Sequence, residues 1–173
     1  MLRRLGVRTW LVLAVVVAAG VAAGLAALWA PSGGSAAPPV RARVYENVDA
    51  CLLAGKNGVQ DPNAAPVWAG MEDASAATSA RVSYLAVAGP ATVAGAESYL
   101  GSLLTEGCRV VVASGGPERS AVLAEASRFP RVRFVVAGAV SGPGNVTAVA
   151  FTTSGMRPAV AAAVESGVRS AGG

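Results

Sequence analysis

The sequence contains no histidine, only two cysteines, and few aromatic side chains, which make up 5% of its 173 residues. Without histidine, the chain lacks the commonest general base and the commonest transition-metal ligand. It has no Gly-x-Ser-x-Gly nucleophile motif, and its carboxylates are spread singly. Glu72 and Asp73 are adjacent, so they point to different sides of a helix and make a poor acid/base pair. We therefore predict that the protein is not an enzyme and uses neither a cofactor nor a metal.

Charged residues are also scarce, at 14% of the chain. The formal net charge of +4 overstates the basicity of the folded part, because Arg3, Arg4 and Arg8 precede a long apolar run. The remaining 11 basic residues nearly balance the 10 acidic ones. The sequence shows no basic helix face and no basic residues interleaved with aromatics, so it does not indicate nucleic-acid binding.

The apolar run covers residues 10–30, "WLVLAVVVAAGVAAGLAALWA". A run of ~20 apolar residues is long enough to cross a bilayer as a helix, and preceding arginines favour the cytoplasmic side. We expect a cytoplasmic flank over 1–9 and a transmembrane anchor over 10–30, with a cleaved signal sequence within 1–37 as the alternative. Either interpretation puts the rest of the chain outside the cytoplasm, on a single-pass membrane protein or a secreted one.

The segment 31–42 is rich in Pro, Gly, Ser and Ala, which is typical of a flexible linker. Residues 43–173 then alternate between apolar runs with strong β-formers and stretches with helical spacing. Strands are expected over 47–55, 80–89, 108–115, 132–138 and 145–151, and helices over 61–78, 91–107, 117–129 and 155–170.

This alternation predicts an α/β fold with a parallel sheet buried on both faces. Five strands with right-handed crossovers form a three-layer, doubly wound sheet in the order 2-1-3-4-5. That order makes the first and third strands neighbours, and these carry Cys51 and Cys108. In an oxidising compartment the two cysteines are expected to form a disulfide, with two separately buried thiols as the alternative.

The helix expected over 117–129 carries Glu118 and Glu125, and both are expected on its exposed face. It follows the corner Ser114, Gly115 and Gly116. Free N–H groups and the helix dipole at such a corner favour an anion or a polar ligand edge. The alternative is that the glycines only permit a tight turn.

The stretch 110–138, "VVVASGGPERSAVLAEASRFPRVRFVVAG", resembles the basic membrane protein family, the nucleoside-binding proteins of certain ABC importers. The resemblance includes the glycine corner, the pair Phe129 and Pro130, and the following Arg133 and Phe134. It also includes "ACLLAGKNGVQD" (50–61) and "WAGM" (68–71), and it extends over about residues 47–164. It implies the N-terminal lobe of a type I periplasmic binding protein, a nucleoside-like polar ligand and an ABC permease partner.

The chain departs from that family at the expected ligand site. Gly55 stands where the family has an Asp that contacts the nucleoside. Asp61 and Asn63 could replace it as polar contacts and Trp68 as a stacking ring, or Asp61 could cap a helix while Trp68 packs against the sheet. The candidate ligand-binding residues are Gly55, Asp61, Asn63, Trp68, Ser114, Gly115 and Gly116.

Two functions therefore remain open. The first is a membrane-tethered solute-binding lobe. The second is a non-transport sensory or protein-interaction module that has lost the ligand pocket. The sequence covers only the first of the family's two lobes, and a single lobe cannot enclose a small ligand. Self-association of two lobes face to face could rebuild a cleft.

Overall fold

The computed structural model describes residues 45–138, 142–150, 152 and 155–172. The expected anchor and linker lie outside these residues. The chain divides into two units, Met1–Ala42 and Arg43–Gly173, and the second is described here. No helix within the described residues is long and apolar enough to cross a bilayer.

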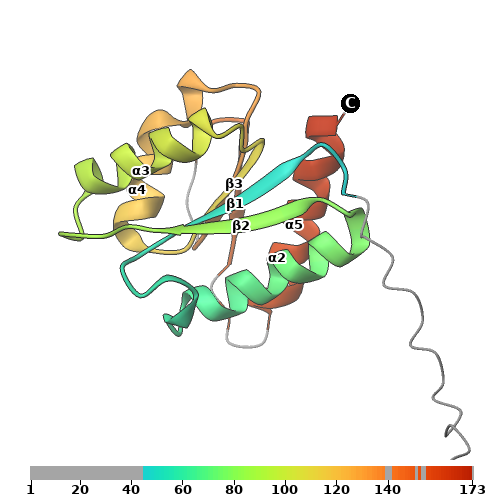
Figure 1. The fold of residues 1–173 in the computed structure, drawn as a ribbon, viewed down its shortest axis with the longest axis horizontal. Helices are drawn as coiled ribbons and strands as arrows, with labels where there is room; N and C mark the ends of the chain where they lie inside the picture. The colour runs from blue at the N-terminus through green and yellow to red at the C-terminus, as the bar shows by residue number, and fades with distance from the viewer. Residues whose placement is uncertain (1–44, 139–141, 151, 153–154, 173) are drawn as a thin grey trace, which may run out of the picture. The chain divides into compact units, whose positions relative to one another are not determined.

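A five-stranded parallel sheet forms the centre of the fold (Figure 1). Its order is β2-β1-β3-β4-β5, as the sequence predicts, although each strand is shorter than its apolar run. The strands are β1 (Asp49–Ala54), β2 (Arg81–Ala86), β3 (Val110–Ala113), β4 (Arg133–Ala137) and β5 (Val146–Val149).

Helices cover both faces of the sheet and complete the predicted three layers. Helices α2 and α5 pack together on one face, and α3 and α4 pack together on the other (Figure 1). The helices are α2 (Ala64–Thr78), α3 (Val93–Thr105), α4 (Gly116–Glu125) and α5 (Met156–Gly172), with short 3-10 helices η1 (Gly58–Gln60) and η2 (Ala126–Arg128).

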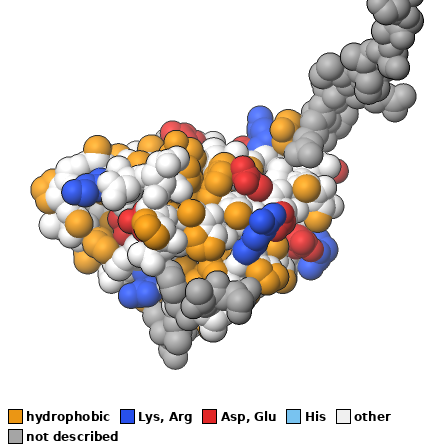
Figure 2. Space-filling view, turned by 90° about the horizontal axis from the view of Figure 1, so that it is seen from below, with side chains coloured by type: hydrophobic (Ala, Val, Ile, Leu, Met, Phe, Trp, Pro, Cys, Tyr) orange, Lys and Arg blue, Asp and Glu red, His pale blue; other side chains and the backbone are white. Residues whose placement is uncertain are grey.

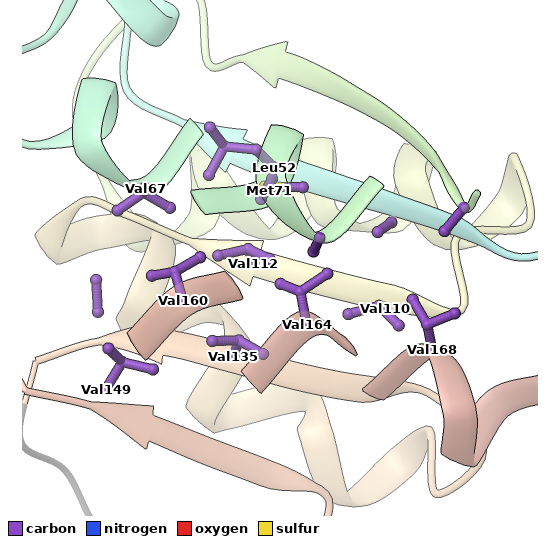
Figure 3. Packing of buried hydrophobic residues seen from close by; sticks show 14 of the residues in the cluster. Leu52, Val67, Met71, Val110, Val112, Val135, Val149, Val160, Val164 and Val168 are labelled. Carbon is purple, nitrogen blue, oxygen red and sulfur yellow. The ribbon is translucent and has the colours of Figure 1, made fainter. Parts of the chain in front are cut away.

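Alternate residues of each strand point to opposite faces, so the sheet separates two apolar cores. In β1, Leu52 faces α2 and α5, whereas Leu53 faces α3 and α4. Figure 3 shows the first core, where side chains from α2 and α5 meet the valines of β3 and β4. Since both faces of the central strands are buried, these strands are apolar after their first residues, Asp49 in β1 and Arg133 in β4, which is the pattern that predicted the fold.

The disulfide between Cys51 and Cys108 is present, with 5.9 Å between the Cα atoms. The two residues are not register partners, because Cys51 lies opposite Val111. Cys108 precedes β3 rather than beginning it, and its N–H donates to the carbonyl oxygen of Leu103 at 3.1 Å. The bond therefore ties β1 to the turn that leaves α3.

Charged side chains are dispersed over the surface. Figure 2 shows one face, on which basic and acidic groups lie close to one another instead of forming a patch of one sign. The ion pair between Arg157 and Asp73 connects α5 to α2 by two hydrogen bonds of 2.6 Å, from Nε to Oδ2 and from Nη2 to Oδ1.

The Arg157–Asp73 pair is expected to make stability depend on pH in acid. The hydrogen bond from Arg157 lowers the pKa of Asp73 below its ordinary value of 3.8. A lowered carboxyl pKa contributes stability above the ordinary value, and this is lost as the pH falls through the folded-state value. Asp73→Asn should therefore melt earlier than the wild type near pH 6, with the difference shrinking as the pH falls below the ordinary value of 3.8. The effect should be small because the pair is solvent-exposed, and an equal difference at both pH values would contradict this assignment.

Candidate ligand-binding site

A cleft of about 500 Å³ opens at the carboxyl edge of the sheet. The loops that follow β1, β2 and β3 line it. It lies where the chain leaves β1 towards α2 on one face and leaves β3 towards α4 on the other. Open α/β sheets bind ligands at such a topological switch point.

Six of the seven candidate residues line this cleft. The loop after β1 supplies Gly55, Asp61 and Asn63, and the corner after β3 supplies Ser114, Gly115 and Gly116. The sequence therefore predicted which residues meet at this edge, because the carboxyl ends of parallel strands lie side by side.

Trp68 is the exception and does not line the cleft. Its indole packs against the core on the α2 side and meets the ring of Tyr84 edge to face, with 5.5 Å between ring centroids. This matches the alternative of a tryptophan packed against the sheet, so the structure provides no stacking ring for a ligand from Trp68.

Asp61 orders the loop before α2 but is not its N-cap. Helix α2 begins at Ala64, with Asn63 as the N-cap residue. The Oδ1 atom of Asp61 accepts a 2.8 Å hydrogen bond from the N–H of Asn63, and its carbonyl oxygen accepts from Ala64 and Ala65. The side chain of Asp61 thus holds a turn at the rim of the cleft and is still partly exposed.

Glu118 is the functional candidate that the sequence did not identify. The expectation that it lies on the exposed face of its helix is wrong, because only 3% of the residue is exposed. It lies in the first turn of α4 and lines the cleft. Glu125 on the same helix is paired with Arg128 near the surface, at 2.8 Å.

Two glycines make room for the carboxylate of Glu118. A Cβ atom at Gly115 would overlap Oε2, and a Cβ atom at Gly55 would lie 3.7 Å from Oε1. The carboxylate therefore lies between the ends of β1 and β3, beside the N-terminus of α4. It places a negative charge where the sequence had suggested room for an anion, so this corner does not favour a second negative group.

Ser114 adds a second buried polar side chain to the cleft. The residue is 7% exposed, and its backbone N–H continues the sheet by donating to Leu53 at 3.4 Å. Its hydroxyl makes no hydrogen bond within the described part of the chain. A serine hydroxyl can donate and accept, so it can serve either kind of ligand atom.

Within the described residues, no group of three or more Cys, Asp or Glu side chains is arranged to hold a metal ion. The cleft is lined by one buried carboxylate, one buried hydroxyl and main-chain groups of three loops, and by the more exposed side chains of Lys56, Asn57, Asp61 and Asn63. Such a surface is suited to hydrogen bonding with a small polar molecule.

Comparison with known proteins supports the fold. No family model matches the chain, and no curated protein matches it. Among solved structures, an ABC transporter system solute-binding protein from Conexibacter woesei DSM 14684 superposes with a TM-score of 0.50 at 24% identity, over 58% of this chain and 34% of that one. A fragment from Peptoclostridium difficile 630, described as a lipoprotein, superposes with a TM-score of 0.57 at 10% identity, over 70% of this chain and 98% of that one.

These likenesses concern architecture, because both sequence identities are low. This chain spans about a third of the Conexibacter protein and nearly all of the Peptoclostridium fragment. The described part of the chain therefore has an α/β fold of the kind found in solute-binding proteins.

Proposed function

We propose that the protein is an extracytoplasmic, membrane-tethered domain that binds a small polar solute at the carboxyl edge of its sheet. The observation that carries the proposal is the cleft of about 500 Å³ at the switch point, which brings two buried polar side chains, Ser114 and Glu118, to one opening. The apolar run 10–30 and the linker 31–42 support the tether. The tether would hold the domain at the outer side of the membrane, where it meets solutes outside the cell.

We further propose a nucleoside-like ligand and a relation to the basic membrane protein family. The order and spacing of the motifs over residues 47–164 support this relation. Gly55 replaces the family's aspartate, but the carboxylate of Glu118 lies beside Gly55 and can offer acceptor atoms in the same region. An ABC permease is the partner that this relation suggests.

Binding is expected to be weak and located at the glycine corner. The described lobe lines the cleft with the loops at one edge of its sheet, whereas small-molecule sites usually bury most of the ligand surface. Adenosine titrated into the full-length chain in detergent, followed by calorimetry, should give a dissociation constant above about 1 μM. Gly116→Asp should abolish the heat signal, because it adds a bulky charge to the cleft rim.

The matched control is Gly101→Ala on α3, where an added Cβ meets nothing within 4 Å. This variant should bind adenosine as the wild type does. Unchanged binding in Gly116→Asp would show that the ligand lies elsewhere, and sub-micromolar binding by a monomer would contradict a one-walled site.

A protein-interaction module is the second candidate function, and the edge strand β2 favours it. Half of its residues are exposed, including Tyr84 at 49%. An edge strand offers unpaired backbone groups to another chain. Specific protein capture without any solute binding would support this function over the first.

A further inference from the structure

We propose that Glu118 selects the ligand by charge, so that the cleft accepts neutral or cationic solutes with hydrogen-bond donors and rejects anions. This inference rests on the proposed solute-binding function and assigns a chemical class to its ligand. It concerns hydroxyl-bearing and amine-bearing solutes, which share the ability to donate to a carboxylate.

The first argument is that the carboxylate of Glu118 lacks a partner. The buried polar side chains of the described residues are those of Ser75, Ser114 and Glu118. Ser75 lies away from the cleft and donates to the carbonyl oxygen of Ala80 at 2.8 Å. Ser114 and Glu118 both line the cleft, and within the described chain neither side chain makes a hydrogen bond or an ion pair. No fully enclosed side-chain nitrogen or oxygen atom of the described residues lacks a partner, so the polar atoms of these two side chains reach the solvent of the cleft.

Buried polar groups are nearly always hydrogen-bonded, and an unpaired buried carboxylate is costly. Here Ser75, away from the cleft, is bonded to the protein, whereas the polar atoms of Ser114 and Glu118 have only the solvent of the cleft as partner. A ligand in the cleft would replace that solvent as the hydrogen-bonding partner of the two side chains.

The second argument is that the carboxylate is held in place. Glu118 shares a helical face with Ala121 and Val122, which are fully buried, so α4 cannot rotate to carry it into solvent without exposing them. Its Oε2 atom occupies the space that only a glycine at position 115 leaves free. Its orientation is therefore set before any ligand arrives.

The third argument is chemical complementarity. An ionised carboxylate only accepts hydrogen bonds, and a negative charge at a helix N-terminus is favourable. The matching ligand atoms are hydroxyl or amine hydrogens, and the neighbouring hydroxyl of Ser114 can extend the contact. A phosphate or carboxylate on the ligand would face Glu118 in a poorly solvated corner, where like charges repel strongly. The cation that lines the cleft, Lys56, is solvent-exposed, so screening weakens its attraction for an anion.

The test uses three probes with the full-length chain in detergent: adenosine, putrescine and adenosine 5′-monophosphate. Calorimetry should detect binding of adenosine or of putrescine. If adenosine binds, the affinity for the monophosphate should be at least tenfold lower than for adenosine. If only putrescine binds, binding of the monophosphate should not be detected. Glu118→Gln keeps the shape but removes the charge, so it should weaken the favoured probe by roughly tenfold and reduce its advantage over the monophosphate.

Two further variants test whether binding depends on the position of the Glu118 carboxylate and whether removing any carboxylate from the surface has the same effect. Gly115→Ala keeps the carboxylate but displaces it, so it should reproduce the loss of binding. Glu106→Gln removes an exposed carboxylate at the end of α3 and should leave every affinity unchanged. Glu118→Gln loses only the favourable charge at the helix N-terminus, so it should still unfold in one cooperative transition, which shows that it is folded.

Tighter binding of the monophosphate than of the other two probes would overturn the inference and leave the proposed solute-binding function intact. Unchanged affinities in a folded Glu118→Gln would do the same. Failure of all three probes to bind the wild type would overturn the nucleoside-like proposal and this inference together. Comparison of adenosine with putrescine distinguishes neutral hydrogen-bond donors from charged ones, since only putrescine carries a positive charge.

Discussion

Reduction of the Cys51–Cys108 disulfide is expected to lower the free energy of unfolding by about 4 kcal/mol. The bond joins residues separated by 57 positions, and the chain-entropy model assigns most of its effect to the unfolded state. Both cysteines are buried in the core beside α3 and α4, so the reduced thiols still fill the same space. Urea unfolding of the full-length chain in detergent, with and without dithiothreitol, measures the difference.

The control is the double variant Cys51→Ala/Cys108→Ala, on which dithiothreitol should have no effect. Mass spectrometry of the protein purified without reductant, after alkylation, should find neither cysteine modified. If the reductant left the wild-type unfolding curve unchanged, the disulfide would not be the constraint that we assign to it.

The pairing of these cysteines was predictable from the sequence because it depends on topology alone. The order β2-β1-β3-β4-β5 makes β1 and β3 neighbours, and no other cysteine is present. The local geometry was not predictable. The hydrogen bonds between these strands begin where Arg109 donates to Asp49, and nothing in the run 108–115 marks that residue as the first one in the ladder.

The location of the cleft was predictable for a similar reason. Glycines that follow apolar runs mark the ends of strands, and parallel order brings those ends to one edge. Gly55 and Gly115 therefore meet beside the cleft. Trp68 could not be placed in this way, because its direction depends on the start and phase of α2, which the Asp61 turn sets.

The burial of Glu118 was missed because a charged residue near the start of a helix is normally solvated. A helical signal was nevertheless present, since Glu118 lies three and four residues before Ala121 and Val122 on the same face. What the sequence could not show is the space for the carboxylate. That space exists because two glycines from different strand ends, Gly55 and Gly115, lie beside the same side chain.

A third glycine, Gly70, marks the contact between α2 and α5, and we expect Gly70→Ala to destabilise the fold by about 2 kcal/mol. A Cβ atom at position 70 would lie 2.5 Å from the carbonyl oxygen of Arg157 and 2.9 Å from Cβ of Val160. Neither atom belongs to a flexible side-chain end, so one helix must move. That movement would loosen the first core, where Val67 and Met71 meet Val160 and Val164 (Figure 3).

The sign of the stability change in Gly70→Ala shows whether the packing clash or the gain in helix propensity is larger. In an open helical position, replacing glycine by alanine stabilises by roughly 0.5–1 kcal/mol. Gly101→Ala on α3 should show that gain, because an added Cβ there meets nothing within 4 Å. Gly70→Ala receives the same propensity gain but should still melt earlier than the wild type. If both variants were stabilised equally in thermal unfolding, α2 and α5 would not be as closely packed at Gly70 as we describe.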